Sequence, residues 1–226
     1  MKSKKIEFAT NHSCMPPLKP AKNFVPKWYK DIKVPKSNSF INDEPEKNVK
    51  SCVPFLDSFM SGYMVELWTE IYVEEKDSGP YLRWAAIPQP IEFRDGSGSP
   101  IPVPEGHHED HLVWKNKHTM QLPKGYSLLI THPLNRFDLP FTTLSAVVDA
   151  DELMTEGNIP FFLKKGFSGI IEIGTPLFQV IPFKRDSWIA EENTSLVQKD
   201  LDKTLEYRRA FRNSYKKLSW HKKEYN

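Results

Sequence analysis

The 226-residue chain contains only two cysteines, Cys14 and Cys52, which are far apart in the sequence. Two separated cysteines do not build the disulfide framework of a small secreted domain, and we expect both to be reduced thiols. No apolar run approaches the roughly 18 residues of a membrane-spanning helix. The residues after the basic start, Met1 to Lys5, do not form the apolar segment of a secretion signal. We therefore expect an unsecreted protein without a membrane partner.

Glycine is also scarce, with 10 residues against 19 prolines. Proline fixes the backbone φ angle and has no N–H donor, so this proportion argues against a mainly helical chain. The glycine-rich fingerprints of phosphate and dinucleotide binding are missing, as is the Gly-x-Ser-x-Gly turn of a serine hydrolase. No motif therefore assigns a reaction, and we expect no cofactor.

Charge is unevenly distributed along the chain, although the formal net charge is only +2. Residues 1–36 carry nine lysines and two acidic residues, and residues 193–226 carry nine basic and four acidic residues, which leaves a net charge of −10 between them. The basic ends could fold onto the acidic body, contact a neighbouring subunit, or bind a polyanion such as nucleic acid. Nucleic acid is the least favoured, because the basic residues are not interleaved with aromatics as in known nucleic-acid modules.

Residues 1–54 are predicted to form a proline-rich arm. Prolines recur every few residues from Pro16 to Pro45, which disfavours a regular helix or a central strand. An apolar cluster around Trp28 and Tyr29 would be unusual in a disordered linker. We expect a short helical turn there, with Trp28 and its neighbours buried against the β core or a neighbouring subunit.

Residues 55–190 show the pattern of a β domain. Apolar and polar residues alternate from Tyr63 to Glu74, which indicates a half-buried antiparallel strand. The segment from Leu82 to Ile87 is expected to pair with it across a turn. Short apolar segments separated by turn signals then follow as far as Phe183. Such a succession is typical of an antiparallel sandwich or barrel, and we predict a jelly-roll-like core.

Residues 191–226 are predicted to form a basic C-terminal helix, because the apolar period becomes helical from about Thr194. An apolar stripe on such a helix requires a partner surface, so we expect the helix to mediate assembly. The competing interpretation is that the helix packs on its own β core. The predicted interface residues of the arm and the helix are Trp28, Tyr29, Leu201, Leu205, Phe211 and Tyr215.

The densest group of metal-ligating side chains is His107, His108, Glu109 and His111. Imidazole and carboxylate could hold zinc or iron, and two histidines with one carboxylate in a jelly roll would suggest a non-haem iron oxygenase. Glu109 and His111 are two residues apart and could converge on one face of a strand. The alternative, a solvated polar loop after Gly106, is favoured, and we expect no bound metal.

A second group of polar residues is concentrated in the segments His132 to Asp138 and Asp149 to Asp151. One interpretation is a turn braced by an Arg136–Asp138 pair, with the two later aspartates as strand-end caps. The other is a polar pocket in which Arg136 holds an anion and Asp149 orients a ligand. The candidate pocket residues are His132, Asn135, Arg136, Asp149, Asp151 and Gln179.

The stretch from Leu122 to Phe183 reads LPKGYSLLITHPLN, then TTLSAVVDAD and GIIEIGTPLFQVIPF. It resembles the core of the dUTPase and dCTP deaminase superfamily. The resemblance implies a β-clip fold, favours threefold symmetry and puts Asp149 at the position of the water-activating aspartate. The stacking aromatic residue of that family is replaced by Glu152 and Leu153, and its Arg-Ser-Ser phosphate motif is missing. We therefore expect no turnover of dUTP or dCTP.

Segments along nearly the whole chain resemble a family of tailed-phage proteins from aquatic bacteria that brings no known activity. The segments are PKWYKDI, CVPFLDSFMSGYM, PKGYS, THPLNRFD and QVIPFKRDSW. The resemblance implies a protein of the host cytoplasm or the virion. With the lost catalytic motifs, it favours a non-enzymatic structural or interaction-mediating role, with a homo-oligomer or other virion proteins as partners. The alternative is a nucleotide- or metal-binding enzyme of phage metabolism, either a dUTPase-like hydrolase or an iron oxygenase.

Overall fold

A five-stranded antiparallel sheet with the order β13-β11-β16-β5-β2 forms one half of the β body. The structure, a computed structural model, describes residues 4–34, 40–41, 44–45, 48–94, 101–153, 156–210 and 213–226. The strands of this sheet are β2 (Lys19–Pro20), β5 (Tyr63–Glu66), β11 (Tyr126–Thr131), β13 (Ala146–Val148) and β16 (Pro176–Lys184). The first five residues of β16 are all buried, as expected for a strand in the interior of a sheet.

A four-stranded antiparallel sheet with the order β12-β14-β9-β8 forms the other half. Its strands are β8 (Ile91–Phe93), β9 (Leu112–Asn116), β12 (Phe141–Thr143) and β14 (Gly157–Leu163). Trp114 of β9 stacks on Phe161 of β14 with the ring centroids 3.7 Å apart, and both side chains are fully buried. This pair belongs to the same hydrophobic cluster as Leu128 and Val180 of the first sheet, so the two sheets enclose one core.

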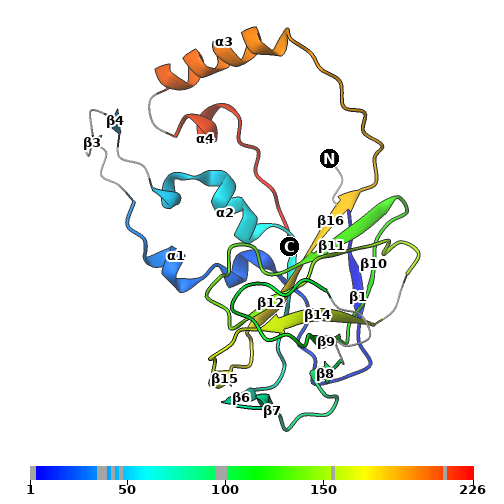
Figure 1. Cartoon of the computed structure of the whole chain (residues 1–226). Helices are drawn as coiled ribbons and strands as arrows, with labels where there is room; N and C mark the ends of the chain where they lie inside the picture. Colours follow the sequence, from blue (N-terminus) through cyan, green and yellow to red (C-terminus); the bar gives the residue numbers. More distant parts are fainter. Residues whose placement is uncertain are drawn as a thin grey trace.

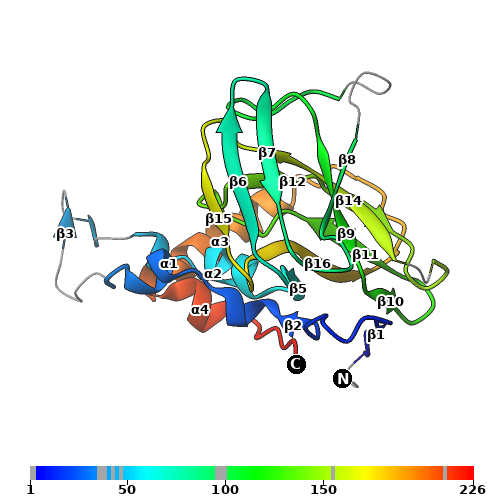
Figure 2. The same cartoon turned by 90° about the horizontal axis from the view of Figure 1, so that it is seen from below.

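The other described strands form one three-stranded sheet and two two-stranded pairs. A three-stranded sheet with the order β15-β6-β7 extends the body (Figure 2). Its strands are β6 (Ile71–Lys76), β7 (Gly79–Arg83) and β15 (Gly169–Ile171). Two-stranded pairs are formed by β1 (Glu7–Ala9) with β10 (Thr119–Gln121) and by β3 (Phe40–Ile41) with β4 (Glu44–Pro45).

The single strand predicted from Tyr63 to Glu74 is two strands that belong to different sheets. Strand β5 ends at Glu66 and β6 begins at Ile71. Between them, the backbone N–H of Leu67 donates to the carbonyl of Thr175. The side-chain alternation continues across this break, so the sequence pattern does not reveal it. The predicted hairpin partner is present as β7, although that strand begins earlier, at Gly79, and ends at Arg83.

Short helices lie on one side of the β body (Figure 2). They are η1 (Ala21–Phe24), α1 (Lys27–Asp31), η2 (Val49–Ser51) and α2 (Val53–Met60). The helical turn predicted near Trp28 is α1. The predicted boundary between arm and core, at residue 54, falls inside α2, a helix that the sequence analysis does not anticipate.

The aromatic residues of the arm pack mainly on α2. Tyr29 is buried, and its ring centroid lies 5.9 Å from that of Phe55 and 5.1 Å from that of Phe59. Trp28 packs edge-on against Phe59 but remains 39% exposed. Tyr29 is therefore buried as expected and Trp28 only in part, but the surface that covers their rings is helix α2 and not the β core.

The C-terminal segment forms two helices, α3 (Leu196–Arg209) and α4 (Ser214–Leu218), where the sequence predicts one. Asn213 precedes α4 with a φ of 58°, a left-handed conformation that ends regular helix. The predicted fold class is confirmed, since the chain is a mainly antiparallel, jelly-roll-like β structure with an N-terminal arm and a helical C-terminal segment. Among the residues that the structure describes, no helix combines the length and apolarity that a membrane span would need.

Candidate functional site

The loop from His132 to Asp138 is held by hydrogen bonds within its own turn. The guanidinium of Arg136 donates from Nε and Nη2 to the carboxylate of Asp138, at 2.9 and 2.8 Å. His132 donates from Nε2 to the carbonyl of Arg136 and accepts at Nδ1 from the backbone N–H of Thr143. Burial lowers the pKa of His132, so its imidazole is neutral at pH 7. These contacts match the interpretation of the segment as a braced turn.

Asn135 and Gln179 connect this turn to helix α2. Asn135 adopts a φ of 59° and donates from Nδ2 to the hydroxyl of Ser58 at 2.7 Å. The amide of Gln179 is fully buried and accepts from the backbone N–H of Leu134 at 3.0 Å. It also donates to the carbonyls of Ser58 and Ser61. Both side chains therefore serve to brace a loop against a helix.

Asp149 and Asp151 meet a residue that the sequence reasoning missed. Arg185 forms ion pairs with Asp151 and, at 3.2 Å, with Asp149. Asp151 also accepts from the backbone N–H of Gly125, and Asp149 accepts from the hydroxyl of Ser127, both at 2.7 Å. The hydrogen bonds from Arg185 and Gly125 hold the pKa of Asp151 at about 2. Arg185 is 34 residues from Asp151 in the chain, so no local spacing signals this pair.

The six predicted pocket residues thus form two groups with different partners. His132, Asn135, Arg136 and Gln179 brace the loop against α2, whereas Asp149 and Asp151 hold Arg185 just after β16. In the part of the chain that the structure describes, no hydrogen bond joins the two groups. Ligand binding by either group remains a prediction.

The histidine loop directs its first two side chains to separate partners. His107 is buried and hydrogen-bonds to the carbonyl of Glu105 and the hydroxyl of Thr142, both at 2.9 Å. His108 lies 2.9 Å from the carboxylate of Glu75. The side chains of His107 and His108 are therefore less exposed than the sequence analysis predicts for a solvated loop.

The other two candidates of this loop lie nearer the surface. Glu109 is exposed, and the ring of the half-buried His111 lies beside that of Phe162. Over the described residues, no group of three or more His, Cys, Asp or Glu side chains is placed to hold a metal ion.

The chain leaves the β body after β16 and exposes apolar side chains. Residues 185–193 have no regular secondary structure, and Trp188 and Ile189 are 88% and 94% exposed. Helix α3, at the top of Figure 1, stands apart from the β body, and none of its described side chains is buried. Val197, Leu201 and Leu205 are spaced by four residues, so they share one helix face, and each is at least half exposed.

The other two predicted interface residues of the C-terminal segment are Tyr215 and Phe211. Tyr215 of α4 is 38% exposed. Phe211 lies outside the described residues.

The last residues of the chain return to the body and dock beside the N-terminal arm. Trp220 donates from Nε1 to the carboxylate of Asp57 at 2.9 Å, and the ammonium of Lys223 pairs with the same carboxylate. The hydroxyl of Tyr63 donates to the carbonyl of Asn226 at 3.2 Å. The segment that contains α3 and α4 is therefore anchored at both ends and projects as a closed loop (Figure 1).

Two phage dUTPases are among the solved structures that this chain resembles. A mutant dUTPase from phage phi11 of S. aureus shares 10% identity at a TM-score of 0.39, over 84% of this chain and 97% of that chain. A mutant dUTPase of Staphylococcus bacteriophage 80alpha with dUpNHpp shares 15% identity at a TM-score of 0.34, over 72% and 86%. No known family matches the sequence, and no curated protein is significantly similar to it. Sequence identities and TM-scores as low as those of the two dUTPases assign no activity to this chain.

Proposed function

We propose that the chain is a non-enzymatic phage protein that acts by assembly, and that α3 is the element that binds a neighbouring copy. The observation that carries the proposal is the exposed apolar face of Val197, Leu201 and Leu205 on a helix that buries none of its described side chains. The phage setting is supported by the sequence resemblance of segments such as PKWYKDI and QVIPFKRDSW.

Leaving the apolar face of α3 in water carries a free-energy cost. Fully burying one Val or Leu side chain contributes about 1.5–3 kcal/mol, and these three are about half exposed, so covering them would contribute roughly 2.5–5 kcal/mol before the entropy of association is subtracted. The body of the same chain does not cover this face. Trp188 and Ile189 add two exposed apolar side chains on the same projecting segment. Exposed apolar side chains that share one helix face, such as those of α3, support an interaction site.

A second copy of the chain has the charge that would complement the projecting segment. Residues 193–226 carry five more basic than acidic residues, whereas residues 37–192 carry a net charge of −10. Within one copy, the two basic ends lie next to each other, and Lys22 donates to the side chain of Asn226 at 3.1 Å. Two lysines of the basic ends pair with acids of the same copy, Lys19 with Glu66 and Lys223 with Asp57. The other acidic residues of the body would attract the basic segment of a neighbour, which would fix the orientation of the contact.

Multi-angle light scattering on the full chain tests the proposal. We expect an oligomer at micromolar concentration, and a shift to monomer when Leu201→Ala is combined with Leu205→Ala. Alanine keeps the helix propensity while it removes apolar area, so a loss of assembly would reflect the contact. Because the contact is mainly apolar, the oligomer should persist in about 1 M salt, where charges are screened over about 3 Å.

A matched control uses the opposite face of the same helix. The pair Lys199→Ala and Glu206→Ala leaves the net charge unchanged and should leave the oligomer intact. A native chain that is monomeric under these conditions would contradict the proposal, as would an oligomer that survives the two leucine substitutions.

A further inference from the structure

The β body contains a cavity of about 320 Å³ at the edge where its two sheets meet. Strands β11 and β13 of one sheet and β9 and β14 of the other contribute to its wall, together with β10. None of the six pocket residues predicted from the sequence lines it. The cavity is thus separate from both the braced turn and the Arg185 cluster.

The floor of the cavity is apolar. Five of its side chains are no more than 7% exposed, namely Met120, Leu128, Ile130, Ala150 and Ile159. An apolar cavity of ~150 Å³ is enough to bind benzene, so the volume here accommodates a body of one or two rings. It is too small for a folded segment of another protein.

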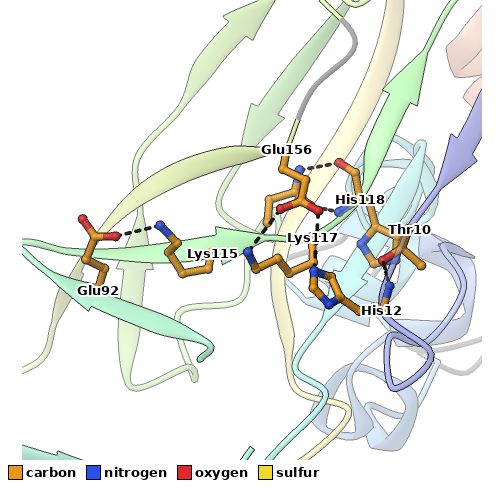
Figure 3. A network of polar contacts seen from close by, with 8 residues as sticks. Thr10, His12, Glu92, Lys115, Lys117, His118 and Glu156 are labelled. Carbon is orange, nitrogen blue, oxygen red and sulfur yellow. Dashed lines mark hydrogen bonds and ion pairs between the residues drawn. The ribbon is translucent and has the colours of Figure 1, made fainter. Parts of the chain in front are cut away.

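Three polar residues that are not buried line the cavity, namely Ser145, Glu156 and Asn158. Glu156 lines it and is half-buried, and its carboxylate pairs with Lys117 at 3.1 Å and lies 3.7 Å from Nε2 of His12. Figure 3 shows both side chains pointing toward the Glu156 carboxylate. His118, which also lines the cavity, is buried, and desolvation lowers its pKa, so it supplies no charge at pH 7.

The amide of Asn116 lines the cavity and is held by the backbone of His118. Its Nδ2 donates to the carbonyl of His118 at 2.9 Å, and its Oδ1 accepts from the backbone N–H of the same residue at 3.1 Å. The carboxylate of Glu156 has two oxygens with several lone pairs, and one ammonium does not use them all. It therefore keeps acceptor capacity for a molecule in the cavity, as does Nδ1 of His118, which has no hydrogen-bond partner among the described residues.

We propose that this cavity binds a small amphipathic molecule whose apolar body, of one or two rings, fills the space between the sheets and whose hydroxyl or N–H group donates to Glu156. Apolar walls with a few placed polar groups are the usual composition of a small-molecule site. The carboxylate would accept a charge-assisted hydrogen bond, which is stronger than a neutral one. This binding does not depend on the assembly of the chain.

Titration of the full chain with 2-naphthol, followed by amide NMR, tests this proposal. We expect saturable binding of one molecule per chain, with shifts concentrated at the cavity-lining amides of Ala146, Ala150 and Gly157. The same ring system without a donor, 2-methoxynaphthalene, should bind about tenfold more weakly. Glu156→Gln should weaken the binding of 2-naphthol and leave the binding of 2-methoxynaphthalene unchanged.

Neighbouring positions on β13 provide a matched pair of variants. Ala146 lines the cavity, whereas Val147 does not and is 62% exposed. Ala146→Phe should fill the mouth and weaken both probes about tenfold or more, and Val147→Phe should bind them as the native chain does. The proposal is overturned if the native chain binds neither probe, if the shifts lie outside the cavity, or if the two Phe variants behave alike.

Discussion

At the scale of single residues, Asp149 and Asp151 show how neighbours decide the state of a side chain. The two are separated by one residue, yet the Asp151 side chain is only 2% exposed and the Asp149 side chain is 62% exposed. Both contact Arg185, but Asp151 also accepts from the backbone of Gly125. The carboxylate of Asp151 therefore belongs to the structure that joins the end of β16 to the neighbouring turn.

We expect Asp151→Asn to destabilise the fold and to remove part of its sensitivity to acid. The pKa of Asp151 is lowered from 3.8 to about 2, so its ionised form stabilises the fold above pH 3.8 and this contribution is lost as the pH falls toward 2. Urea unfolding at several pH values measures both effects. Asp149→Asn is the control, and equal losses of stability in the two variants would contradict the account.

At the scale of elements, the link from α2 to β5 depends on one glycine. Gly62 has a φ of 73°, and a Cβ atom there would lie 2.1 Å from the carbonyl oxygen of Val180. Gly62→Ala combines left-handed strain of about 1–2 kcal/mol with this clash, so we expect the free energy of unfolding to fall by about 3 kcal/mol or more.

Gly125→Ala separates the two causes, because Gly125 has a φ of 83° but open space around its Cα. The loss there should be about 1–2 kcal/mol. Chemical denaturation measures the free energy of unfolding of both variants. If the two substitutions lower it equally, the close approach of β16 to Gly62 does not contribute to the loss of stability.

The sequence allowed the prediction of elements whose pattern is local. Alternation predicted the β body, and a helical period predicted a C-terminal helix from about Thr194. The break between β5 and β6 was not predictable, because the pairing of Leu67 with Thr175 sets it and not the side-chain pattern. Helix α2 was missed because Tyr29, distant in sequence, covers its aromatic face.

The residues of the candidate sites were predictable only where one turn contains them. The Arg136–Asp138 brace is local and was among the interpretations of its segment. Arg185 was missed because a fold contact joins it to Asp151. The cavity beside Glu156 has no local signature, since five strands and their connections form its wall.

At the scale of the whole molecule, the structure combines a β body that has one continuous core with a projecting loop that contains α3. The core is continuous between the sheets, and the tail is tied to Asp57 by Trp220 and Lys223. The loop that contains α3 leaves several large apolar side chains in water, among them Trp188 and Ile189, and the body exposes others, such as Ile87 and Phe137. The proposed assembly through α3 would account for this combination of an anchored tail and an exposed helix.

Hydrogen exchange of the α3 amides, residues 196–209, tests this account most directly when it is measured below and above the concentration at which the chain assembles. An isolated exposed helix opens easily, and a helix covered by a neighbour opens only with the assembly. The account predicts that exchange of these amides slows on assembly, and slows less in the Leu201→Ala and Leu205→Ala variant. Equally fast exchange of α3 in the free and assembled states would contradict it.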